Sequence, residues 1–316
     1  MSHVTLTVTL TGDHRYGRRL PPQALGHALT ALPTVVRQSV SMAFRGRSGV
    51  RGPRPRWLKA ATDIRFIDHT GEDDSVLVFE APTLGEAAPE LYQQHEFWST
   101  RPDPSDTGLD LLGDVVRDLA AHDGDSDRFD KALLGNIAGF KNVFNGCFRE
   151  LRLGSTRQGP TAPAVITPEV LTNAREFRTA TPLPQSVRVV GRLDMVRAST
   201  QGFALHLDDG QEVRGVLLTG SVVEAAAHLT RRVMVLGRAI YRASGRLLRV
   251  DADEITAADG ESSFWSRIPA AKSKRFDLRQ VLQDQDHKEG IGAILGRWPG
   301  VETDEEIEGC LKRISP

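Results

Sequence analysis

The sequence predicts an α+β protein: an N-terminal α+β domain, then a small OB-like β-barrel, then an extended C-terminal arm with a short helix. Three observations lead to this prediction. Mixed helix and strand patterns occupy 1–155, and five strand patterns with one short helix occupy 165–260. Over 261–316 the apolar clusters are small and isolated, which is typical of an arm that binds a partner. At 316 residues the chain is long enough for two folded cores.

The composition excludes several classes of protein. Hydrophobic residues make up 40% of the chain and charged residues 26%, and the formal net charge is -1, so neither a disordered chain nor a globally basic protein is expected. Cys147 and Cys310 lie far apart and lack disulfide or metal spacing, which favours a reduced, cytoplasmic setting. We expect no secretion signal and no membrane anchor, because no stretch approaches the roughly 20 apolar residues that span a bilayer.

The first domain begins with a strand and a helix. Valines and leucines alternate with threonines over 4–10, the period of a half-buried strand. Leucines and valines then recur at helical spacing over 23–44, although Pro33 should kink or divide that helix. Two strands joined by a turn are predicted over 63–82, and two amphipathic helices over 109–119 and 129–148.

A linker and a barrel follow. The Gly/Pro-rich run "GSTRQGPTAPA" predicts a break between domains, and "TPE" at 167–169 predicts a helix start. Beyond it the patterns give three strands, a short helix and two strands, with Gly191 and Gly237 inside strands where a barrel must bend. This is the order of an OB-type five-stranded barrel.

The search for catalytic motifs is negative. No nucleophile elbow, zinc-binding helix motif, Cys/His metal spacing or phosphate-binding loop is present, so we expect no catalytic residues, no metal, no cofactor and no enzyme. Asp110 and Asp114 share a helix face at the spacing of paired acid/base carboxylates, but their apolar neighbours favour an ordinary solvated face.

One segment has the composition of a nucleic-acid contact. Basic residues and one aromatic gather in a Gly/Pro-interrupted stretch: Arg45, Arg47, Arg51, Arg54, Arg56, Trp57 and Lys59. Guanidinium groups bind phosphate and an indole can stack on a base. The alternative is a basic loop that is mobile or that docks on acidic surface of the same protein. The barrel adds Arg188, Arg192, Arg197, Arg214, Arg238 and Tyr241, but interleaved acidic residues favour salt-bridged strand surfaces there.

The arm contains two apolar stripes. Thr303 and Glu306 form a capping-box pattern, which predicts a helix over 304–314. So short a helix is marginal in water without a partner. The arm either folds back on its own domains or docks on another protein through these residues: Ile291, Ile294, Leu295, Arg297, Trp298, Pro299, Ile307, Leu311 and Ile314.

The segment "ILGRWPGVETDEEIEGCLKRIS" resembles the toxin-wrapping tail of VapB-type antitoxins, which neutralise PIN-domain ribonucleases. Val301 stands where an acidic residue is usual in that family. The resemblance implies that Trp298 anchors the tail, that Arg297 enters the toxin's acidic metal site, and that the helix stripe fills the groove. It does not extend to the rest of the chain.

The sequence therefore predicts a non-enzymatic antitoxin-like protein. Its arm would bind and inhibit a PIN-type ribonuclease toxin, and its folded domains would sense a release signal. The alternative is a nucleic-acid-binding protein that uses the OB-like barrel and the arginine-rich segment.

Overall fold

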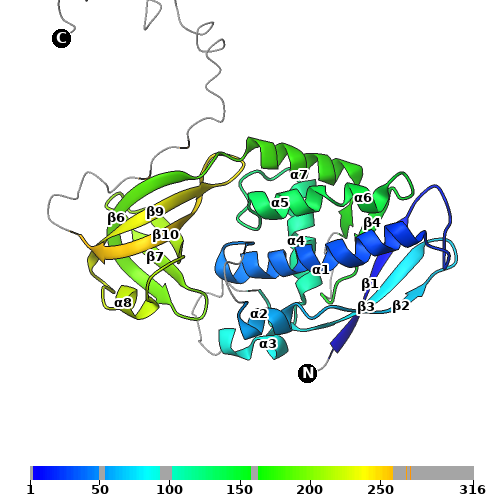
Figure 1. The fold of residues 1–316 in the computed structure, drawn as a ribbon, viewed down its shortest axis with the longest axis horizontal. Helices are drawn as coiled ribbons and strands as arrows, with labels where there is room; N and C mark the ends of the chain where they lie inside the picture. Colours follow the sequence, from blue (N-terminus) through cyan, green and yellow to red (C-terminus); the bar gives the residue numbers. More distant parts are fainter. Residues whose placement is uncertain are drawn as a thin grey trace, which may run out of the picture. The chain divides into compact units, whose positions relative to one another are not determined.

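The computed structural model describes residues 3–49, 54–92, 102–157 and 163–258, together with 268 and 271. The chain divides into two units, Met1–Lys272 and Ser273–Pro316. An α+β domain and a β-barrel, both in the first unit, contain the described helices and strands (Figure 1). Among the described residues, none of the helices is long and apolar enough to cross a membrane. The α+β fold class with a barrel, predicted from the sequence, is confirmed.

The α+β domain is built on an antiparallel sheet of order β2-β3-β1-β4-β5. Its strands are β1 (His3–Thr11), β2 (Arg65–Thr70), β3 (Ser75–Pro82), β4 (Glu150–Leu153) and β5 (Ala164–Ile166). Its helices are α1 (Pro22–Arg45), α2 (Arg56–Ala61), α3 (Leu84–Ala87), the 3-10 turn η1 (Pro89–Leu91), α4 (Gly108–Ala120), α5 (Lys131–Ala138), α6 (Lys141–Phe144) and α7 (Pro168–Ala180).

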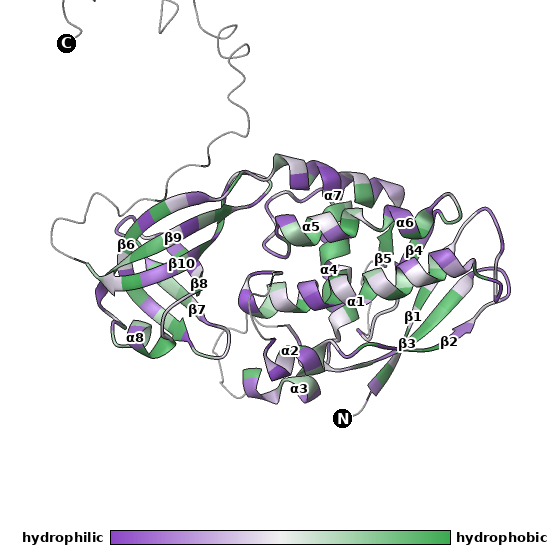
Figure 2. Cartoon of the chain, in the orientation of Figure 1, coloured by the Kyte–Doolittle hydropathy of each residue, from purple (hydrophilic) through white to green (hydrophobic). Residues whose placement is uncertain are grey.

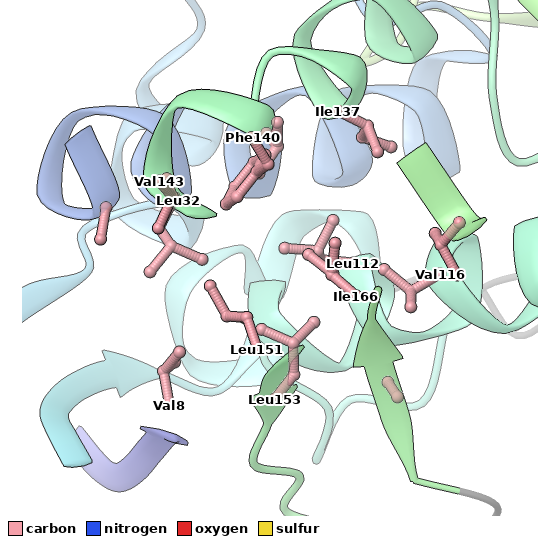
Figure 3. Packing of buried hydrophobic residues seen from close by; sticks show 14 of the residues in the cluster. Val8, Leu32, Leu112, Val116, Ile137, Phe140, Val143, Leu151, Leu153 and Ile166 are labelled. Atoms are coloured by element: carbon pink, nitrogen blue, oxygen red, sulfur yellow. The ribbon is translucent and has the colours of Figure 1, made fainter. Parts of the chain in front are cut away.

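The alternation of apolar residues and threonines in β1 gives the half-buried strand that it predicts. Leu6, Val8 and Leu10 are buried, and Leu6 and Val8 lie opposite Phe79 and Leu77 of β3. The main core gathers around these strands, and it also includes buried leucines of β4 and Ile166 of β5 (Figure 3).

Of the two effects predicted for Pro33, a kink or a division, the division does not occur, because α1 is one helix from Pro22 to Arg45. Ala28 and Leu32 before the proline and Val35 and Val36 after it all lie in the same core, and this packing holds both halves to one surface. Figure 2 shows the mixed hydrophilic and hydrophobic residues of an amphipathic helix along α1.

The helix predicted over 129–148 is instead two short helices, α5 and α6. Gly139 ends α5, and Asn145 takes the left-handed conformation (φ 33°) that ends α6. Phe140 lies between the two helices and is fully buried, beside Val143 in the core (Figure 3). A single straight helix would have carried the chain away from β4.

The predicted boundary between the two domains also differs from the structure. Strand β5 pairs with β4, and α7 buries Val170, Leu171 and Ala174 in the core of the α+β domain. Phe177 of α7 stacks on Phe129, with ring centroids 5.9 Å apart. The Gly/Pro-rich run after 153 is therefore part of the β4–β5 connection inside the α+β domain and not a linker between domains.

The barrel is closed, with strand order β10-β8-β7-β6-β9. Its elements are β6 (Gln185–Arg197), β7 (Gly202–His206), β8 (Glu212–Leu217), α8 (Val222–Ala226), β9 (Arg232–Tyr241) and β10 (Leu247–Ala257). The first strand pairs with the fourth, the third pairs in parallel with the fifth, and the helix lies between the third and fourth. This is the predicted OB-type arrangement.

Gly237 is required by the barrel wall. A Cβ at this position would lie 2.2 Å from the carbonyl oxygen of Asp251 on β10, and 2.8 Å from the Cα of Ala252. The β9–β10 register shifts next to this contact, between Ala252 and Glu254. The strands approach too closely here for any side chain.

We expect Gly237→Ala to lower the free energy of unfolding by about 1–3 kcal/mol, because backbone must move to admit the methyl group. Gly26→Ala is the matched control, since a Cβ at this exposed site in α1 meets no heavy atom within 4 Å. That change should stabilise the protein by up to about 1 kcal/mol. Urea unfolding measures both; equal effects would contradict the close approach.

Candidate functional site

The arginine-rich segment, residues 45–59, is not one exposed loop. Arg45 ends α1 and is buried, and Arg47 in the following turn is also buried. Arg54, Arg56 and Lys59 are exposed at the start and along α2, and Arg51 lies outside the described residues. The structure thus separates a buried pair of arginines from an exposed basic group.

The indole of Trp57 is buried, so it is not available to stack on a base as one interpretation of this segment required. Its side chain is only 5% exposed and packs edge-on against Phe44, with ring centroids 5.5 Å apart. The two rings belong to a small core between α1, α2 and α3. Trp57 is buried because it lies on the apolar face of α2 with Leu58 and Ala61, although arginines are its neighbours in the sequence.

Positive charges lie close together in this region. Burial and then the charge of Arg54 lower the pKa of Arg37, which lies on α1. Burial and then the charge of Arg47 lower the pKa of Arg45 to about 10. Among the described residues, no carboxylate opposes either shift. Like charges held this close together favour the binding of an anion.

Asp130 joins the turn after α1 to the barrel. This buried carboxylate accepts hydrogen bonds from the backbone N–H and the hydroxyl of Ser48, and it caps α5 by accepting from two backbone N–H groups. Nη1 of Arg249, on β10, lies 3.5 Å from it and donates to the carbonyl of Gly46 at 2.9 Å. Arg249 also donates to Asp251 at 2.7 Å.

A second contact joins the domains through Asp125. Ser244 and Arg246, in the turn between β9 and β10, donate to its carboxylate, and Arg242 donates to its backbone carbonyl. In the turn between β6 and β7, Gln201 accepts from Arg45 at 3.4 Å. OB-type barrels commonly use these two turns to bind ligands. Here both turns contact the α+β domain.

The barrel residues singled out from the sequence differ in burial and in their contacts. Tyr241 is 2% exposed and belongs to the barrel core, and burial raises the pKa of its hydroxyl. Arg214 pairs with Glu212 on its own strand at 3.0 Å. Arg188 and Arg192 are exposed, and Arg197 and Arg238 are half-buried.

Asp110 and Asp114 do not lie on a solvated helix face, as their spacing and neighbours had predicted, because Asp110 is buried and Asp114 is largely covered. Burial raises the pKa of Asp110, but hydrogen bonds from Ser155, Thr107 and Thr156 outweigh it, and the net pKa is lowered. Asp110 forms a capping box with Thr107 at the start of α4. Its role is to fasten the β4–β5 connection to this helix.

Arg157 completes this network. It donates to both carboxylate oxygens of Asp106, each at 2.7 Å, and to both of Asp114, at 2.6 and 2.9 Å. These two carboxylates raise its pKa. Sequence reasoning missed Arg157, Asp106, Asp130 and Arg249, because ion pairs between distant residues leave no periodic signal; only Asp130, directly before a helix pattern, carried a capping signal.

Two small cavities lie in the described part of the chain, where no group of three His, Cys, Asp or Glu side chains could hold a metal ion. One cavity of about 260 Å³ lies between α1 and the α5–α6 corner and is lined by residues such as His27, Thr34 and Asn142. The other, about 70 Å³, adjoins Asp110 and Arg157. At the first cavity the hydroxyls of Thr30 and Thr34 donate to backbone carbonyls of α1, and at the second the hydroxyl of Ser155 donates to Asp110.

The predicted partner-binding residues, from Ile291 to Ile314, lie outside the described residues. Comparisons with protein-family models, with curated proteins and with solved structures give no match.

Asp110→Asn is expected to lower the free energy of unfolding at pH 7 by about 2–3 kcal/mol, because an amide cannot accept all the hydrogen bonds that the carboxylate accepts. A carboxyl group with a lowered folded pKa stabilises the protein above its unfolded pKa of about 3.9 and loses this effect as pH falls. The difference between wild type and variant should therefore shrink between about pH 5 and about pH 3 in urea titrations.

Asp127→Asn is the control, because this side chain is exposed. It should change stability by less than about 0.5 kcal/mol. A loss of stability in Asp110→Asn that stays constant with pH would show that the charge of Asp110 does not contribute.

Proposed function

We propose that this chain is an antitoxin-like protein whose C-terminal arm binds and inhibits a PIN-type ribonuclease. The arm sequence carries the proposal, since the run from Arg297 to Gly300 precedes a helix pattern with a capping box and one apolar face. The division of the chain after Lys272 supports it, because both folded domains end before this motif begins. Two cysteines without disulfide spacing fit a cytoplasmic protein.

Inhibition has a direct chemical basis. A PIN nuclease holds Mg²⁺ with clustered carboxylates to hydrolyse phosphodiesters. A guanidinium placed among these carboxylates competes with both the metal and the substrate. Arg297 is our candidate for this group, and Trp298 is the adjoining apolar anchor, a residue type that often dominates binding energy.

The folded domains would then control release. A ligand that binds them better when the arm is free must, by linkage, weaken the arm's hold on its partner. The chain would act without catalysis of its own, as a sensor and inhibitor.

Trp298→Ala should weaken binding of the PIN-type partner by on the order of 2 kcal/mol or more, because the indole would leave a desolvated pocket. The partner is first identified by capture from the native host with the full chain and with a version ending at Ala270. Affinity is then measured by calorimetry, and inhibition by cleavage of RNA with the purified nuclease.

Gln285→Ala, in the arm but outside the motif, is the matched control and should bind like wild type. Capture of the same proteins by both versions would overturn the proposal. So would a large drop in the melting temperature of free Trp298→Ala, since this would mean that Trp298 packs on its own chain.

A second candidate function, nucleic-acid binding, is favoured by one observation. Arg37 on α1 lies close enough to Arg54 for the two charges to repel, and exposed Arg56 and Lys59 follow along α2. Exposed positive charges that lie close together in the chain are what contact with a phosphate backbone requires. The burial of Trp57 and Tyr241 removes base stacking from this candidate, so it predicts binding without base preference.

If this surface binds nucleic acid, replacing Arg54 and Arg56 by Ala should lower affinity for every oligonucleotide alike. The replacement should also reduce the slope of log K against log salt by about 1 for each arginine that binds a phosphate in the wild type. Arg214→Ala, which removes an exposed but paired arginine on the barrel, should leave the slope unchanged. Fluorescence anisotropy from about 50 to about 200 mM salt measures both slopes; an unchanged slope in the double variant would exclude this surface.

A further inference from the structure

The buried arginine at the end of α1 lacks a counter-charge among the described residues. Arg45 is 7% exposed, and its Nη1 atom is closed off from solvent without a hydrogen-bond partner. Its Nη2 atom donates to the neutral amide of Gln201, at 3.4 Å. A buried guanidinium with one long hydrogen bond to a neutral group is costly, and structures usually pair such a group with an anion.

The carboxylates of the domain junction are already engaged. Asp130 accepts from Ser48, from the start of α5 and from Arg249, and Asp251 accepts from Arg249. Arg47 adds a second positive charge, and burial together with this charge lowers the pKa of Arg45 to about 10. The C-terminal end of α1 favours a cation, but its backbone does not provide a partner for Nη1.

The turn beside these arginines leaves room. A Cβ built at Gly46 or Gly49 would meet no heavy atom within 4 Å, and Gly49 is exposed. The backbone of this turn is therefore uncovered at these two glycines. Guanidinium groups suit phosphoryl oxygens in particular, because their planar N–H donors match two oxygens at once.

We propose that Arg45, where α1 meets the β6–β7 turn of the barrel, is the ligand of a binding site for a phosphoryl group, with the positive charge of Arg47 beside it. Since Arg45 belongs to the α+β domain and Gln201 to the barrel, the bound anion stabilises the junction of the two domains. This site does not depend on the arm or on the surface at Arg54 and Arg56, so it can hold or fail independently of both proposed functions.

The test is thermal unfolding of the full chain with inorganic pyrophosphate as the probe, against sodium chloride at matched ionic strength. The wild type should gain several degrees in melting temperature with a saturable dependence on pyrophosphate. Arg45→Met keeps the approximate length of the side chain and removes its charge. It should melt no lower than the wild type without anion, and it should lose the gain.

Two further variants keep the test decisive if Arg45→Met does not fold. Gln201→Glu places a carboxylate where the neutral amide meets Arg45, so it should raise the anion-free melting temperature and weaken pyrophosphate binding at least tenfold. Arg214→Met, at an exposed arginine of the barrel that pairs with Glu212, should keep the full gain. A gain that persists in Gln201→Glu, or no gain in the wild type beyond that of salt, overturns the site.

Three ligands distinguish the source of the phosphoryl group. Equal affinity for pyrophosphate and a nucleoside triphosphate indicates the free anion, and at least tenfold tighter binding of the triphosphate indicates a nucleotide. Binding of an oligonucleotide without terminal phosphates that is abolished in Arg45→Met but kept in Arg214→Met indicates a backbone phosphate. Failure of all three to bind in an Arg45-dependent way overturns the proposal.

Discussion

The carboxylate of Asp130 is the constraint on which the arrangement of the folded part depends. It caps α5, holds the turn after α1 through Ser48, and lies beside Arg249 of the barrel. Burying a carboxylate costs free energy unless its oxygens accept hydrogen bonds, so these elements must all be in place together. The same turn contains the arginines of the proposed phosphoryl site, and anion binding and domain contact therefore share one segment.

Two arginines of this protein carry the same charge in opposite surroundings. Arg157 is held by two aspartates in bidentate contacts, and its pKa is raised. Arg45 donates to a neutral amide, and its pKa is lowered. The first is a fastening between a helix and a loop. The second is suited to bind an anion, because its buried charge costs free energy that an anion would offset.

These features combine into one functional picture. The arm would carry the inhibitory contact, and the two domains would carry a site whose occupant stabilises their junction. The two turns that an OB-type barrel commonly uses for ligands contact the α+β domain here, so a ligand at Arg45 acts on the contact between the domains. A signal that alters this contact would suit the release step of the proposed function.

The sequence by itself determined the α+β class, the strand of alternating valine and leucine, and the barrel order, because these follow from local periodicity and turn residues. It did not determine that α7 joins the first core, that Trp57 is buried, or that Asp110 sits in a network of hydrogen bonds. Nor did it pair Arg157 with Asp106 or Asp130 with Arg249. Tertiary structure decided these because each depends on residues brought together from distant positions, and such contacts leave no period in the chain. The arginine-rich segment shows this most clearly. Its composition predicted that it binds an anion, but only the tertiary structure shows which of its arginines are buried and which are exposed.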